Sequence, residues 1–123
     1  MTTTNTAAEQ EKKPREETIV RVLIDHHAKP GEADRVVQAI TDLRKEAMKQ
    51  PGNITGETLI NVEDPSNVLV ISTWRNVKDW QAWDTSPLRI ELTKKQNALL
   101  EKPYTVKMYH YKMLKEHRVW STV

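Results

Sequence analysis

The chain has 123 residues, enough for one domain of ordinary size, and its 37% hydrophobic and 29% charged residues fit a globular protein. The 19 basic and 17 acidic side chains leave a net charge of +2, which favours neither nucleic acid nor a membrane as partner. There is no cysteine, which excludes disulfides and cysteine metal sites. No stretch approaches membrane-spanning length and the N-terminus lacks the apolar core of a signal peptide, so we expect a cytoplasmic protein.

The N-terminal segment, residues 1–18, is rich in threonine and charged side chains and has almost nothing apolar to bury. Such a segment cannot offset the entropy cost of ordering itself. We expect a disordered arm or, alternatively, an arm that lies over a partner subunit. The folded domain is expected to span residues 19–114, with a short C-terminal tail at residues 115–123.

The first predicted strand runs from Ile19 to His27 and ends at the turn Lys29-Pro30-Gly31. Alternate side chains of a strand point to opposite faces. The face predicted to pack under helices carries Val20, Val22, Ile24 and His26.

The clearest helix is predicted over Glu32–Lys49, where apolar residues recur at three- and four-residue spacing. The turn-forming run Gln50–Asn53 stops it. Two strands follow, Ile54–Val62 and Val68–Trp74, and the turn-rich connector between them predicts a hairpin. Gly56 within the first of them indicates a bulge or a close backbone approach.

Two helix starts come next. Asn76 can cap a short helix from Val77 to about Trp83, and Ser86 with Pro87 gives a strong start signal for a longer helix. The buried stripe of that longer helix is predicted to consist of Leu88, Leu92 and Leu99.

The last predicted strand runs from Tyr104 to Leu114, so the order of elements is β-α-β-β-α-β, the α+β ferredoxin-like arrangement. Helices on one face of such a sheet leave the other face open. That second face would carry apolar side chains, which favours burial in a symmetric homodimer. The residues expected there are Ile19, Leu23 and either Tyr109, Tyr111 and Met113 or their even-numbered neighbours.

The most informative motif is a set of tryptophans around the short helix. Trp74 ends a strand, Trp80 and Trp83 follow nine residues or fewer later, and Asp84-Thr85-Ser86-Pro87 comes directly after. This motif resembles the antibiotic-biosynthesis-monooxygenase family of small dimeric α+β barrels, and in particular its haem-degrading branch. The resemblance covers roughly Ile19 to Leu114. It implies a dimeric α+β barrel with a ligand cleft between the helix layer and the sheet.

The resemblance to the haem-degrading branch is incomplete. That branch implies a tryptophan before the Ser-Pro helix start, here Trp83, together with a first-strand asparagine and an iron-binding helix histidine. Thr93 stands where the histidine would fall, and the first strand has no asparagine. We therefore expect no metal and no dedicated cofactor. Haem would need a substitute ligand, such as His26 or His110.

The broader family implies cofactor-free oxygenases, in which the anion of an electron-rich phenol or quinol passes an electron to oxygen. The predicted function is a monooxygenase acting on a planar aromatic or quinol-like small molecule. The predicted catalytic residues are His26, as a base of near-neutral pKa, and Trp83. The predicted ligand pocket adds Trp74, Trp80 and His110.

Two other classes stay open. The tryptophans also fit simple core packing, so the protein could be a non-enzymatic small-ligand or haem-binding protein. It could also be a structural subunit held by its arm and tail. Oxygen consumption, binding without turnover, or the absence of a pocket would distinguish the three.

Overall fold

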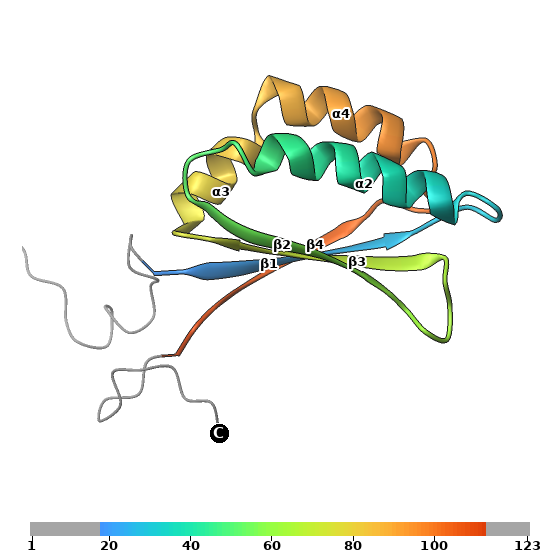
Figure 1. The fold of residues 1–123 in the computed structure, drawn as a ribbon, viewed down its shortest axis with the longest axis horizontal. Helices are drawn as coiled ribbons and strands as arrows, with labels where there is room; N and C mark the ends of the chain where they lie inside the picture. Colours follow the sequence, from blue (N-terminus) through green and yellow to red (C-terminus); the bar gives the residue numbers. More distant parts are fainter. Residues whose placement is uncertain (1–17, 113–123) are drawn as a thin grey trace, which may run out of the picture.

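The computed structural model describes residues 18–112, in which three helices pack on one face of an antiparallel sheet of four strands (Figure 1). The predicted N-terminal arm apart from Thr18, the C-terminal tail, and Met113 and Leu114 at the end of the last predicted strand lie outside the described residues. The strand order is β2-β3-β1-β4. This order confirms the ferredoxin-like α+β fold expected from the sequence. The elements in chain order are β1 (Val20–His27), α2 (Ala33–Ala47), β2 (Asn53–Ile60), β3 (Asn67–Trp74), α3 (Val77–Asp84), α4 (Pro87–Asn97) and β4 (Thr105–His110).

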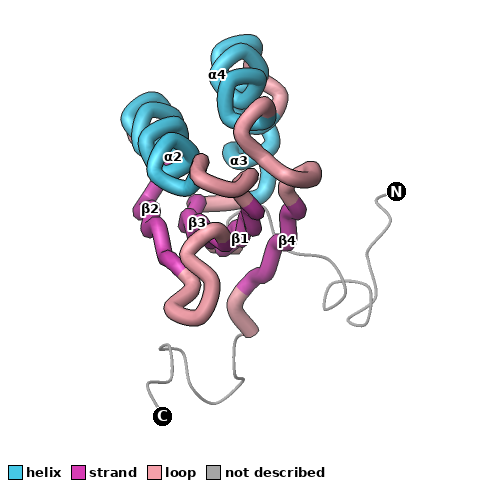
Figure 2. Tube along the Cα trace, turned by 90° about the vertical axis from the view of Figure 1, so that its right-hand side faces the viewer, coloured by secondary structure: helices cyan, strands magenta, loops and turns pink. Residues whose placement is uncertain are grey.

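Strand β1 lies between β3 and β4 and shows the predicted alternation along its whole length. Its even-numbered side chains are buried beneath the helices, and its odd-numbered ones are only half-buried on the other face. Helix α2 contributes the apolar stripe Val36, Ile40 and Leu43 to the same layer. The core thus lies in a single layer between the helices and the sheet. Figure 2 shows the helix layer and the sheet end-on.

The hairpin of β2 and β3 is confirmed, but the irregularity in β2 is not where a bulge was considered. The register with β3 shifts between Asn53 and Thr55, which leaves Ile54 as the extra residue. Gly56 instead meets the other expectation, a close approach, because a side chain there would stand 3.1 Å from Nε of Arg44. Gly56 therefore makes room for an arginine that crosses from α2 to the sheet.

Both predicted helix caps are confirmed. The Asn76 side chain accepts a hydrogen bond from the backbone N–H of Asp79, and Ser86 does the same for Arg89. Capping by these side chains satisfies N–H groups that a helix start leaves without partners.

The predicted buried stripe of α4 is wrong at Leu88, which is 43% exposed. The buried residues of this helix are Arg89, Thr93 and Gln96, while Leu92 and Leu99 are half-buried beside them. The orientation of α4 follows from its first turn, where Arg89 reaches back to Asp84 at 3.1 Å. That contact turns the polar stripe inward and Leu88 outward.

Strand β4 forms one edge of the sheet and ends at His110, short of the predicted end. Tyr109 pairs with Arg21 and so faces away from the helices, while His110 pairs with Val20 on the helix side. The open face of the sheet, as we call the side without helices, carries Leu23, Leu59, Leu69, Ile71 and Tyr109.

Within residues 18–112, none of the helices is both long enough and apolar enough to cross a bilayer.

Candidate functional site

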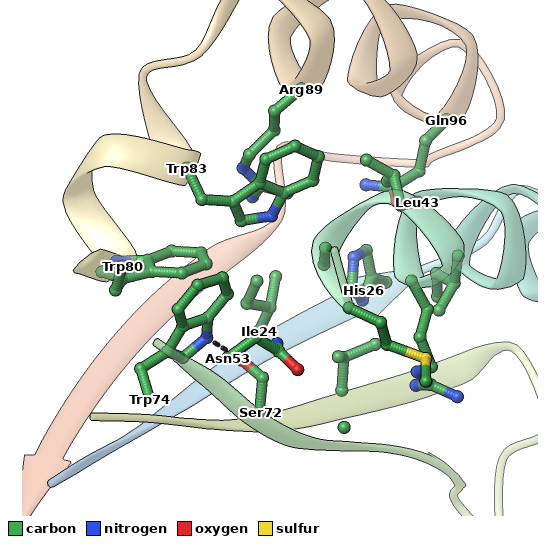
Figure 3. Close-up of a pocket in the computed structure, with 16 residues that line it drawn as sticks. Ile24, His26, Leu43, Asn53, Ser72, Trp74, Trp80, Trp83, Arg89 and Gln96 are labelled. Carbon is green, nitrogen blue, oxygen red and sulfur yellow. Dashed lines mark hydrogen bonds between the residues drawn. The ribbon is translucent and has the colours of Figure 1, made fainter. Parts of the chain in front are cut away.

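A cleft opens between the helix layer and the sheet, in the place that the family resemblance implies (Figure 3). It holds about 560 Å³ of empty space, part of which is open to solvent. Its lining comes from β1, α2, β2, β3, α3 and α4, so every layer of the fold contributes to it. A mostly apolar cleft with a few polar side chains is the kind of lining that small-molecule sites have.

Three tryptophans form one wall of the cleft (Figure 3). Trp74 ends β3, and its Nε1 donates a hydrogen bond to Oγ of Ser72 at 3.0 Å. Trp80 and Trp83, three residues apart on α3, project from one side of that helix and are each 3% exposed. The Trp74 and Trp80 rings meet nearly edge to face at 5.8 Å, a favoured aromatic geometry. The wall is therefore rigid and apolar.

His26 faces this wall from the sheet and is 2% exposed. Its Nδ1 lies 3.1 Å from the carbonyl oxygen of Val68, which can only accept, so Nδ1 carries the hydrogen and donates. Burial lowers the pKa of His26, against the opposing effects of the Val68 hydrogen bond and of Asp25, while the positive charge of Arg89 lowers it further. His26 is thus neutral near pH 7, with a lone pair on Nε2.

Helix α4 brings two polar side chains that the sequence did not single out. Arg89 is 5% exposed and Gln96 is 2% exposed, and both line the cleft. The guanidinium of Arg89 lies 5.1 Å from the ring centroid of Trp80, within cation–π range. The leucines near them misled the sequence prediction, although the seven-residue spacing of Arg89 and Gln96 places both on one helix face.

We infer that the mouth of the cleft lies between α2 and β2, because the most exposed lining residue, Met48, lies there. Arg44 crosses it and donates a hydrogen bond from a terminal nitrogen to Oγ1 of Thr58. Met48 and Asn53 line the cleft at the same level. The exposed Met48 side chain is flexible and apolar, so it suits the entrance for an aromatic ligand.

The structure brings together four of the five predicted site residues: His26, Trp74, Trp80 and Trp83. The fifth, His110, is not among the lining residues, which corrects its placement in the pocket. It pairs with Val20, at the opposite end of β1 from His26, and it is exposed on an edge strand. Because β4 is the edge strand, no further strand of residues 18–112 lies beyond it to cover His110.

The residues present do not fit haem ligation in the expected way. The hydroxyl of Thr93 donates to the carbonyl oxygen of Ile90 at 3.0 Å, and Thr93 is not part of the cleft lining. No group of three or more histidine, aspartate or glutamate side chains among residues 18–112 is placed to hold a metal ion. Residues 18–112 therefore offer neither the expected helix histidine for haem iron nor a cluster of ligands for another metal ion.

The fold is shared with solved structures of low sequence identity. A conserved protein from Methanosarcina mazei Go1 is 18% identical, with a TM-score of 0.72, over 79% of this chain and 96% of that one. SnoaB, a cofactor-independent oxygenase from Streptomyces nogalater, is 11% identical, with a TM-score of 0.71, over 81% of this chain and 99% of that one. A Shewanella oneidensis protein is 14% identical, with a TM-score of 0.70, over 77% and 92%. Among curated protein sequences, none matches this chain.

Sheet, helix layer and cleft together define a small ferredoxin-like α+β protein with a cleft between its helices and its sheet. The family model described as antibiotic biosynthesis monooxygenase matches residues 19–91, more than half of the chain. The chain belongs to the antibiotic biosynthesis monooxygenase family.

Proposed function

We propose that this protein is an oxygen-dependent monooxygenase that acts on a planar aromatic phenol or quinol without a dedicated cofactor. The observation that carries the proposal is one cleft that holds a buried, neutral histidine opposite a wall of three tryptophans. Family membership supports it, as does the fold shared with a cofactor-independent oxygenase.

The reaction asks the protein to bind, to remove a proton and to exclude water. His26 accepts the hydroxyl proton of the ligand at Nε2, because Nδ1 is committed to the Val68 carbonyl. The resulting quinolate is electron-rich and transfers an electron directly to O2. The tryptophan wall stacks on the planar ring and keeps water away from the reacting carbon.

The stoichiometry can be written for 1,4-naphthohydroquinone as a probe. One molecule reacts with one O2 to give 2-hydroxy-1,4-naphthoquinone and one water. One oxygen atom forms the new ring C–O bond, and the other leaves as water with two hydrogens of the substrate. The electrons lost by the ring equal those taken up by O2, so no external reductant enters.

The test is the reaction of this hydroquinone under ¹⁸O2, followed by mass spectrometry of the quinone. We expect one labelled oxygen atom in the product, and a rate about 100-fold lower in His26→Ala, a typical loss for a general base. Trp83→Ala is expected to weaken binding of the ring, while the control His27→Ala, on the open face, leaves both unchanged. Unlabelled 1,4-naphthoquinone formed at the rate of protein-free buffer would show that the protein is not a monooxygenase. Saturable binding without turnover would then indicate a ligand carrier.

We also propose that two copies associate through the open face of the sheet. Its apolar side chains are half-buried or exposed, and no layer of residues 18–112 covers them. The side of the sheet that carries the cleft is covered by the helices, so association through the open face leaves the cleft accessible.

A further inference from the structure

The inward stripe of α4 is polar, although it faces an otherwise apolar cleft. Arg89, Thr93 and Gln96 are all buried there. The hydroxyl of Thr93 is satisfied by the Ile90 carbonyl. The other two side chains line the cleft and are not satisfied in this way.

Arg89 carries a buried charge with an incomplete set of partners. Its Nε donates to Asp84 at 3.1 Å, and its guanidinium lies over the ring of Trp80. Asp84 is 40% exposed and is not part of the cleft lining. The structure gives the terminal nitrogens of Arg89 no hydrogen-bond acceptor among residues 18–112. A buried guanidinium is strongly stabilised when an oxyanion accepts from its planar fork of donors.

Gln96 provides a second, independent sign of a polar ligand. Its side chain is buried and extends from α4 to the cleft, as Figure 3 shows. No described residue forms a hydrogen bond with its amide. The amide is open to the cleft, so a ligand or a water in the cleft is expected to complete its hydrogen bonds.

The charges around the cleft have one sign. The ionisable groups that line it are Arg44 from α2, His26 from β1 and Arg89 from α4, and none of the described lining residues is acidic. Asp25 lies on the opposite face of β1, and Asp84 lies outside the lining next to Arg89. A proton added to His26 would place another cation near Arg89. An oxyanion between the two would stabilise both.

We propose that Arg89 and Gln96 form an oxyanion-binding site, which holds the ionised hydroxyl group of the aromatic ligand that the tryptophan wall contacts. The identity of that ligand rests on the proposed function, whereas binding of its anion does not depend on reaction with O2. The O–H bond of the ligand breaks, its electron pair stays on oxygen, and the proton moves to Nε2 of His26. Arg89 and the Gln96 amide then donate to the oxygen.

The experiment uses alizarin, a planar hydroxyanthraquinone whose colour changes when its hydroxyl group ionises. The full chain is titrated with the dye in the absence of oxygen at a series of pH values. We expect the anion to bind about 10-fold or more tightly than the neutral dye, so that the bound dye ionises at lower pH than the free dye. This preference is expected to disappear in Arg89→Met and to reverse in Gln96→Glu, which adds a like charge at the same volume.

Two further variants keep the result interpretable. Arg35→Met removes the same charge from the exposed face of α2 and is expected to leave the preference unchanged. Gln96→Leu keeps the Arg89–Asp84 contact, so it tests the site even if Arg89→Met does not fold. An unchanged preference in both Arg89→Met and Gln96→Leu overturns the proposal. Loss of the preference in Arg44→Met alone also overturns it, because the anion would then sit at the mouth.

Two remaining outcomes are equally decisive. If folded wild-type protein does not bind the dye, or binds it only as the neutral form, the proposal is wrong. If binding of 2-naphthoate depends on Arg89 while binding of the dye does not, the site takes a carboxylate and not an ionised hydroxyl.

The two proposals can be told apart. Anion binding without any ¹⁸O incorporation would leave the oxyanion site standing and refute the monooxygenase function.

Discussion

A backbone carbonyl sets the tautomer of His26 and burial lowers its pKa. The hydrogen bond of its ring at Nδ1 goes to that carbonyl and not to a carboxylate. The carbonyl of Val68 fixes the tautomer, and the helix layer removes water from the ring. The Tyr104 ring packs 5.7 Å away at a tilt of 42° and covers another part of the imidazole. Burial lowers the pKa of His26 by more than the Val68 hydrogen bond raises it, so the lone pair at Nε2 stays available at neutral pH.

The lowered pKa of His26 makes the stability of the protein depend on pH in a defined direction. Burial places the pKa below its ordinary value of 6.5, so the unfolded chain takes up a proton before the folded protein does. The contribution of His26 to the free energy of unfolding is fully present above pH 6.5 and is lost as pH falls through the folded pKa. The loss has a slope of at most about 1.4 kcal/mol per pH unit. In His26→Gln this part of the slope should vanish, as measured by urea unfolding between pH 4 and 8 (roughly the range over which histidine titrates). His27→Gln is the control, and an unchanged slope in His26→Gln would contradict the assignment.

At the scale of elements, the junction from β3 to α4 positions the whole tryptophan wall. Two short helix starts, capped by Asn76 and Ser86, set the directions of α3 and α4. The turn before β2 supports the same junction, because Gly52 accepts a hydrogen bond from the backbone N–H of Arg75 at 2.7 Å. Arg75 in turn pairs with Asp79 on α3. Local capping and one turn therefore fix where Trp80 and Trp83 point.

Loss of either cap should be measurable. Ser86→Ala and Asn76→Ala each remove the acceptor for a helix-start N–H, so each should lower the free energy of unfolding by about 1 kcal/mol. Both variants, unlike Thr85→Ala, should also change ligand affinity, because the caps fix the directions of the helices that carry or follow the tryptophans. Thr85→Ala, whose hydroxyl bonds an exposed helix carbonyl, is the comparison and should have a smaller effect. Equal, small effects in all three variants would argue against a positioning role for the caps.

Gly52 is expected to resist substitution more strongly than either cap. Its φ is +84°, which a side chain rarely adopts, and an added Cβ would collide with the side chain of Asp79. Gly52→Ala should destabilise the protein by about 1–3 kcal/mol. Gly31→Ala is the matched control, because Gly31 has a similar φ of +77° and an added Cβ there would meet nothing within 4 Å. Thermal unfolding of both variants separates the collision from backbone strain, and an equal effect in both would contradict a collision at Gly52.

At the scale of the whole molecule, the two faces of the sheet differ in whether helices cover them. One face is covered by helices and holds the cleft, and the other presents an apolar strip that includes Leu23, Ile71 and Tyr109. The Arg21–Glu57 ion pair, at 3.5 Å, lies on the same face, where Arg21 is the strand partner of Tyr109 and Glu57 that of Ile71. The apolar side chains of this face therefore alternate with a charged pair that is already matched within one copy.

The proposed dimer can be tested by placing a charge in this strip. Ile71→Lys should convert the dimer to a monomer at micromolar concentration, because an unpaired ammonium group in an apolar interface is costly. Light scattering coupled to size exclusion measures the mass. The control is Ile90→Lys, which makes the same change on the outward side of α4, where the side chain is 49% exposed. A wild-type monomer, or a dimer that survives Ile71→Lys, would rule out association through this face.

The amino-acid sequence by itself determined the order of elements, the alternation in β1 and both helix caps. These features depend on residues close together in the chain, whose periodicity and hydrogen-bonding groups act locally. It also indicated His26 and the three tryptophans as candidates. Only the tertiary structure decided which candidates meet. His110 was separated from the cleft by the register of β4 on β1, a pairing between distant segments.

The tertiary structure also decided the inward face of α4. Hydropathy favoured Leu88, yet the Arg89–Asp84 contact and the Trp80 ring rotate the helix so that Arg89 and Gln96 enter the cleft. Burial of a charged and an amide side chain runs against the apolar pattern from which a helix face is predicted. The sequence therefore did not predict that Arg89 and Gln96 line the cleft. Their position depends on how α4 is rotated against the sheet, which the apolar periodicity of the helix does not give.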